Sequence, residues 1–139
     1  MPISPRPDQL QALAEGAPNG SLYMLNLLKF KDKAEYADGR ETDLSGAEAY
    51  GLYAEGVGKI LAQMGGRLVF GGRTNVLLIG DGDLEWDQVA IVEYPNVDAF
   101  RQMTASEEYQ AIHVHREAGL EHQLLINCLS AEQVAEMTS

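Results

Sequence analysis

The segment from Ser21 to Phe30 constrains the fold most, because it is apolar on both of its alternating faces. Side chains in an extended strand point alternately to opposite faces, so residues two apart share a face. One face carries Leu22, Met24, Leu28 and Phe30 together with Asn26, and the other carries Tyr23, Leu25 and Leu27. A strand with one solvated face alternates apolar and polar residues instead. This strand must therefore be covered on both sides.

Helices and strands are predicted to alternate in the order β-α-β-β-α-β. The strands are expected at 21–30, 67–79, 86–94 and 124–129, and the two main helices at 45–64 and 97–116. Ser45 and Glu48 form the pattern of a capping box at the start of the first helix. This order is that of a ferredoxin-like α+β domain with an antiparallel four-stranded sheet.

Both main helices contain further sequence patterns that predict how they pack and where they bend. In the first, an apolar stripe at three- and four-residue spacing is predicted to face the sheet: Ala49, Leu52, Tyr53, Gly56, Ile60 and Met64. In the second, Ser106 is a further N-cap candidate, which predicts a kink there, and Gly119 is expected to end the helix. Gly71 and Gly72 predict either a bulge in the second strand or a place where another backbone or a ligand comes close.

Residues 1–139 are predicted to form one domain, with its ferredoxin-like core at 20–129. An extension at 1–19 contains a short helix from Asp8 to Glu15, and a last short helix lies in 130–139. Between the first strand and the first main helix, Lys31–Ser45 is rich in charge and has no periodicity. Two interpretations remain open for this loop: a functional lid or partner contact, and a surface excursion.

Two helices cover only one face of such a sheet, although its strands are apolar on both faces. An exposed apolar face of that size is rare in a soluble monomer. A second copy of the same sheet, packed face to face, covers it most simply. We therefore expect a homodimer.

Composition excludes several classes of partner. The net charge of −11 disfavours nucleic acids and anionic membranes as partners. The start of the chain lacks the basic and apolar stretches of a signal peptide, and no run is long enough to span a membrane. A cytoplasmic protein is expected. Cys128 is the one cysteine, and its apolar surroundings predict a buried core thiol.

The strongest candidate cluster for chemistry lies on the second main helix. Tyr109, His113 and Arg116 follow at spacings of four and three, so they share one face. There, Arg116 would anchor a small carboxylate or enolate, and His113 would move its proton. The alternative is structural: Tyr109 packs on the sheet, His113 bonds a backbone carbonyl, and Arg116 pairs with a glutamate.

Three further residues are predicted to line the same pocket. Asn26 is either a ligand-facing amide or part of a cross-strand hydrogen bond, for example with Asn127. Arg73 follows two glycines and lies either at the pocket mouth or in solvent. Tyr53 reaches the pocket from the first main helix.

A metal site is not expected in this chain. His113 and His115 are two residues apart, so on a helix they point to different sides, whereas a helical pair of ligands has a spacing of three or four. No cofactor is expected either.

Short motifs along the chain resemble the domain of unknown function 1330 family over residues 20–129. They are Met24-Leu25-Asn26, Gly71-Gly72-Arg73, Val92–Asn96 with Phe100, and Ser106–Gln110 with Arg116. The resemblance implies membership of the dimeric α+β barrel superfamily, in which two ferredoxin-like units pack sheet to sheet. Its members include cofactor-free monooxygenases, muconolactone-type isomerases, haem-degrading enzymes and simple ligand binders, so the fold leaves the reaction open.

Three functions follow as expectations. The first is a homodimeric small-molecule-binding protein, as a binder or as a cofactor-independent enzyme acting on a small anionic or carbonyl compound. The second is a non-catalytic ligand-binding or stress-associated module. The third is a haem-binding or haem-degrading protein, because Asn26 and His113 resemble the matching Asn and haem-ligating His of such relatives. Tyr94, however, stands where those relatives have a tryptophan.

Overall fold

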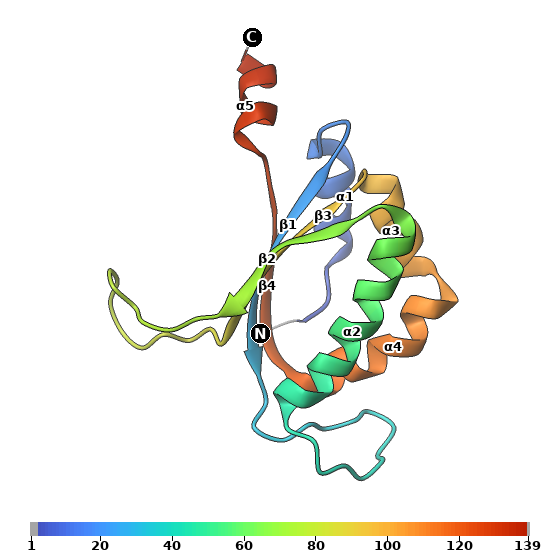
Figure 1. The fold of residues 1–139 in the computed structure, drawn as a ribbon, viewed down its shortest axis with the longest axis vertical. Helices are drawn as coiled ribbons and strands as arrows, with labels where there is room; N and C mark the ends of the chain where they lie inside the picture. The colour runs from blue at the N-terminus through green and yellow to red at the C-terminus, as the bar shows by residue number, and fades with distance from the viewer. Residues whose placement is uncertain (1–2, 139) are drawn as a thin grey trace.

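The computed structural model describes residues 3–138. Its elements are α1 (Pro7–Gly16), β1 (Leu22–Phe30), α2 (Gly46–Met64), β2 (Arg67–Arg73), β3 (Gln88–Tyr94), α3 (Val97–Ala105), α4 (Glu107–Gly119), β4 (Leu120–Cys128) and α5 (Ala131–Thr138). The strands form one antiparallel sheet in the order β2-β3-β1-β4. Helices α2, α3 and α4 cover one side of it (Figure 1). The predicted ferredoxin-like α+β fold is confirmed.

We call the covered side of the sheet the helix face. Here the core is built by buried strand residues such as Leu28 and the pairs of Leu22 with Tyr94 and Met24 with Val92, which face each other across β1 and β3. Residues directly paired across antiparallel strands share a face. The same register therefore puts Asn26 and Gln123 on the helix face as well.

Helix α2 begins as predicted, with Ser45 Oγ accepting from the Glu48 backbone N–H at 3.0 Å and the Glu48 carboxylate accepting from Ser45 N–H at 2.9 Å. Its predicted apolar stripe is confirmed in part, since Ala49 is buried and Tyr53, Ile60 and Met64 pack against the core. The buried residues are Gly46, Ala49, Tyr50, Val57 and Leu61, while Leu52 is exposed. The apolar stripe divides because α2 packs on two neighbours. Gly56 lies so close to α4 that a Cβ there would meet Ile112 at 2.9 Å.

The second helical region breaks where the sequence predicts. Ser106 Oγ accepts from the Tyr109 backbone N–H at 3.2 Å and donates to the Met103 carbonyl at 2.7 Å, so one side chain closes α3 and starts α4. The break sets the direction of α4, which carries the candidate cluster.

Strand ends differ from the prediction. β2 ends at Arg73 rather than at residue 79, because pairing with β3 reaches no further than Gln88. The register of β2 shifts between Leu68 and Phe70, just before Gly71-Gly72, where the bulge was predicted. β4 starts earlier than predicted, at Leu120, since its polar first half also pairs with β1, although with a register shift between Lys29 and Phe30.

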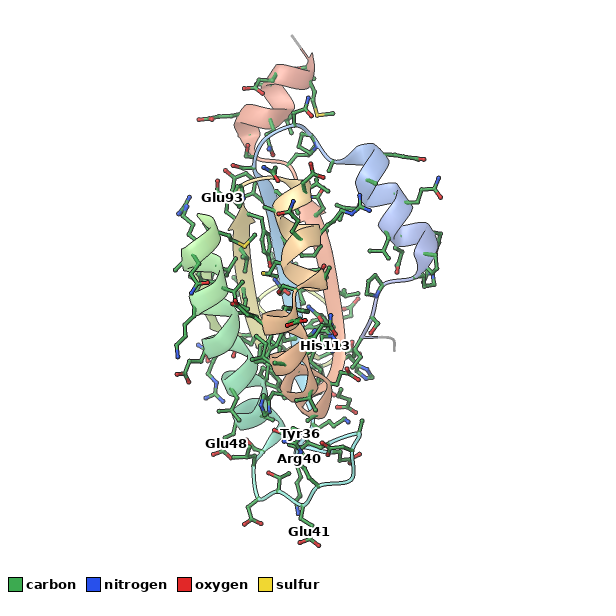
Figure 2. The ribbon with its side chains drawn as sticks, turned by 90° about the vertical axis from the view of Figure 1, so that its right-hand side faces the viewer. Tyr36, Arg40, Glu41, Glu48, Glu93 and His113 are labelled. Atoms are coloured by element: carbon green, nitrogen blue, oxygen red, sulfur yellow. The ribbon has the colours of Figure 1, made fainter. Side chains whose placement is uncertain are left out.

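The loop between β1 and α2 is packed against α4 rather than being a loose surface excursion. Tyr36 is buried, and its hydroxyl lies 2.7 Å from Nδ1 of His115 in a hydrogen bond. Backbone bonds from Lys31 and Glu35 to the end of α4 add to this attachment. Figure 2 shows Tyr36 and Arg40 gathered in this loop at one end of the molecule.

The opposite side of the sheet, the outer face, carries no helix (Figure 1). The register places these residues on it: Tyr23, Leu25, Leu27, Phe70, Val89, Ile91, Leu124, Ile126 and Cys128. Cys128 is half-buried on this face, not in the core that the sequence suggested. Within residues 3–138, no helix is long and apolar enough to cross a membrane.

Candidate functional site

A cavity of about 510 Å³ lies on the helix face, between α1 and strands β1 and β4. α1 stands apart from α3 and α4 (Figure 2), and none of its residues is buried. Its apolar side chains Leu10 and Leu13 form one wall. Met24 and Leu125 form the opposite wall on the sheet. The volume falls within the range typical of small-molecule sites.

Arg116 of α4 reaches one end of this cavity and is 9% exposed. Its Nη2 donates to the Ile3 carbonyl and, at 2.5 Å, to Gln123 Oε1. Among the residues described, no carboxylate forms an ion pair with it. A buried charge without an opposite charge costs several kcal/mol, about 3–5 when a partner is removed. Within residues 3–138, the guanidinium is thus bonded only to neutral oxygens, which favours binding of an anion there.

A hydrogen bond between two side-chain amides fixes the orientation of the Gln123 oxygen that accepts from Arg116. Gln123 Nε2 donates to Asn26 Oδ1 at 2.8 Å, and Asn26 Nδ2 donates to the Ala90 carbonyl at 3.2 Å. Because each amide has one carbonyl oxygen and one donor group, this chain aims the oxygen of Gln123 at the guanidinium. Asn26 therefore makes cross-strand hydrogen bonds, and it holds the cavity residue Gln123 without lining the cavity itself. Asn127 bonds elsewhere, to the Tyr23 carbonyl at 3.1 Å.

Tyr50 and Tyr53 of α2 lie near enough to Arg116 to interact with its charge, and Tyr109 of α4 contacts Tyr53. The hydroxyls of Tyr53 and Tyr109 are 3.0 Å apart and share a hydrogen bond. Burial raises the pKa of Tyr50 to about 12 and raises the pKa of Tyr53 further, although the nearby Arg116 charge lowers both. Burial therefore favours the neutral, hydrogen-bonding form of the Tyr50 and Tyr53 hydroxyls.

His113 lies away from the cavity lining. Its Nδ1 is 2.7 Å from Glu117 Oε1, and its ring centroid is 5.6 Å from that of Tyr109. The structure thus joins His113 to Tyr109 and Glu117, while Arg116 points to Gln123. Neither His113 nor Asn26 is among the residues lining the cavity, and Tyr94 is buried against Phe100. The haem alternative therefore gains no support from the geometry.

Arg73 is at another place on the molecule. It lines a polar groove of about 690 Å³ with Phe30, Lys31 and Asp87, and no residue of this groove also lines the Arg116 cavity. The sequence could not show this separation, because the distance between two strand residues depends on the sheet order. No group of three or more His, Cys, Asp or Glu side chains in the described part of the chain is placed to hold a metal ion.

The sequence missed two parts of the site, Gln123 and helix α1. Gln123 was left out because the fourth strand was predicted to start at the apolar run beginning with Leu124. Its signal was available, since in an extended chain Gln123 shares a face with Leu125. For α1, the signal is the apolar spacing of Leu10, Leu13 and Ala17, a stripe that must face something.

Solved structures with the same fold include one close in sequence. A protein of unknown function from Rhodopseudomonas palustris is 34% identical, with a TM-score of 0.80, covering 91% of this chain and 94% of that chain. Its methylated form is 35% identical with the same TM-score of 0.80, covering 94% and 96%. A dimeric ferredoxin-like protein of unknown function from Bacteroides fragilis, 12% identical, covers 79% and 96% at a TM-score of 0.50 and shares the fold alone.

Family membership follows from the sequence match. No curated protein matches the chain. The model of one family, described as a domain of unknown function (DUF1330), matches residues 34–127, which hold α2 to α4 and most of β4. Arg116 and Gln123 lie within the matched region, whereas α1 lies outside it. The chain belongs to the DUF1330 family.

Proposed function

We propose that this protein is a homodimer that binds a small carboxylate-bearing molecule at Arg116 in each subunit. The observation that carries this is a buried guanidinium, without a carboxylate partner among residues 3–138, at the end of a cavity of about 510 Å³. Arginine holds carboxylates through two parallel N–H···O bonds, which a lysine cannot match.

The hydrogen bonds of Arg116 leave room for such a ligand. Both bonds described above start from Nη2, and a guanidinium has five N–H donors. One of the two acceptors is the backbone carbonyl of Ile3, an uncharged oxygen from the segment before α1. A ligand carboxylate is a stronger acceptor and would replace it.

The outer face supports the homodimer. Phe70 is 59% exposed there, and Leu124 and Ile126 are also exposed. The segment between β2 and β3 extends on this side of the sheet (Figure 1), with Leu78 and Ile79 each 89% exposed. A second sheet packed on this face would bury these side chains.

The test compares Arg116→Gln with Arg101→Gln, an identical change at an exposed position of α3. Titration calorimetry with benzoate as the probe should show binding to the wild type and to the Arg101 variant. The Arg116 variant should bind at least tenfold more weakly, because a neutral amide replaces the buried charge. Equal binding by both variants would overturn the proposed site. Native mass spectrometry of the wild type tests the assembly, and a monomer would contradict the dimer.

A second candidate is cofactor-independent proton transfer at His113, which lies outside the lining of the Arg116 cavity. The observation that favours it is the Glu117 carboxylate 2.7 Å from His113 Nδ1, since a carboxylate that orients an imidazole is a common arrangement in proton transfer. Exchange of the methyl protons of pyruvate in D₂O, followed by NMR, should be slower with His113→Gln than with the wild type. Equal exchange would exclude the catalytic role and leave binding at Arg116 untouched.

A further inference from the structure

We infer that the ligand is a monocarboxylate with an apolar tail, the tail lying between α1 and the sheet. This inference rests on the proposed binding of a carboxylate at Arg116 and extends it from the head group to the whole molecule. Two features of the cavity carry it: the distribution of charge along its wall, and the way α1 stands off from the sheet.

Charge is confined to one end of the cavity. Among the described residues that line it, Arg116 is the one charged side chain, with Gln123 and Asn127 as polar neighbours on β4. The rest of the wall is mostly aliphatic or aromatic, including Leu13 of α1, Phe100 of α3 and Met24 of β1. An unpaired second carboxylate in such surroundings would lose its hydration without a counter-charge. The wall therefore matches one anionic head and an uncharged body.

The two long walls are apolar and meet only in part: Leu13 of α1 and Ala17 just after it pack against the core, while Leu10 stays 50% exposed. Helix α1 turns Leu10 and Leu13 toward the cavity, yet none of its residues is buried. Across the cavity, Leu125 belongs to the helix face but is 44% exposed, because α2, α3 and α4 do not cover it. An apolar helix face normally packs directly on its sheet. Here the contact is incomplete, and a ligand tail in the cavity would touch both walls and remove the exposed Leu10 and Leu125 from water.

Head and tail sites share one segment of the chain. Ile3 supplies the carbonyl on Arg116, and α1 follows at Pro7. Binding of the head group displaces that carbonyl, and binding of the tail draws α1 toward the sheet. Both halves of the ligand therefore act on the same segment, 3–16.

The experiment measures how affinity depends on tail length. Butanoate, hexanoate and octanoate are titrated into the full-length wild-type protein by calorimetry, or by NMR for the weak ligands. Each buried methylene should raise the affinity about fourfold until the tail fills the cavity. Octanedioate, which has the length of octanoate and a second carboxylate, should bind at least tenfold more weakly than octanoate.

A substitution in the cavity wall tests binding of the tail separately from binding of the head group. Leu13→Asn should weaken octanoate binding about tenfold and leave butanoate binding nearly unchanged, because the head group does not touch α1. Val134→Asn makes the same kind of change on exposed α5, away from the cavity, and should alter neither. Circular dichroism checks that both variants fold.

The outcomes separate the inference from the proposed function. Affinity that is independent of tail length, or octanedioate binding as tightly as octanoate, would overturn the inference. If binding were still lost in Arg116→Gln, the carboxylate site itself would stand. Absence of binding by every carboxylate tested would overturn both.

Discussion

The two faces of the sheet are built from equally apolar strands but meet different surroundings. On the helix face, Leu22, Leu28 and Tyr94 are buried under α2, α3 and α4. On the outer face, Phe70 and Ile126 have no cover from their own chain. The helix face also contains the amides Asn26 and Gln123, which are bonded to one another. Alternation in a strand therefore tells which residues share a face, and the covering elements decide whether that face becomes core, site or interface.

The largest expected effect comes from the close packing behind the helix face, where the backbones of α2 and α4 touch. A Cβ on Gly119 would lie 2.3 Å from the Gly46 carbonyl oxygen and 3.0 Å from the Tyr50 nitrogen. Gly119→Ala should therefore lower the free energy of unfolding by about 3 kcal/mol or more, measured by urea denaturation. Gly58→Ala on α2, where a Cβ meets open space, should instead stabilise by up to about 1 kcal/mol. A stable Gly119 variant would mean that the helices can separate without cost.

Substitutions on the outer face should weaken the dimer rather than the fold of each subunit. Leu25→Glu introduces a charge on β1 in the middle of that face, and desolvating it against a second sheet is costly. The dimer should dissociate at least a hundredfold more readily, as measured by light scattering over a dilution series. Leu52→Glu, on the exposed side of α2, is the matched control and should leave the dimer intact. If both variants behaved alike, the outer face would not be the subunit contact.

The smallest expected effect is a loss of folding stability at low pH, caused by Glu93 on the outer face. The Ser21 hydroxyl, donating to Glu93 at 2.7 Å, and then the Arg67 guanidinium at 2.8 Å hold the pKa of the Glu93 carboxyl below its usual value, although partial burial opposes them. A lowered folded-state pKa stabilises above the unfolded pKa, and this stability is lost as pH falls through the folded one.

The matching experiment removes the stronger of these two partners. Ser21→Ala should cost about 1 kcal/mol at pH 7 and much less at pH 3, as measured by urea denaturation at both pH values. An equal loss at both would show that the hydroxyl acts by packing, not through the carboxylate.

Much of the fold was predictable because local physics specifies it. The capping box at Ser45, the N-cap at Ser106 and the alternation in β1 all have short-range causes, and the structure confirms them. Strand ends were less predictable. Where β2 stops depends on where β3 runs out of residues to pair, which is a property of two strands together.

The candidate site was predictable in part. Asn26 stands out as a polar residue in an apolar strand, and Arg116 by its helical spacing from Tyr109 and His113. Both belong to one chain of hydrogen bonds that runs through Gln123. Arg73 was grouped with them because the sequence does not show at which end of a strand another element arrives. The cavity itself was not predictable, since the apolar stripe of α1 is the same whether the helix rests on the sheet or stands off from it.

The segment between β2 and β3 has a consequence for how this protein behaves when it is newly made. Val76, Leu77, Leu78 and Ile79 are four consecutive apolar residues without charge, and three of them are more than 70% exposed. Short segments of high β-propensity and no charge readily pair with copies of themselves. Until another surface covers this run, each chain carries a point from which aggregation can start. The soluble yield of the protein should therefore fall for outer-face variants, even when their folding is unharmed.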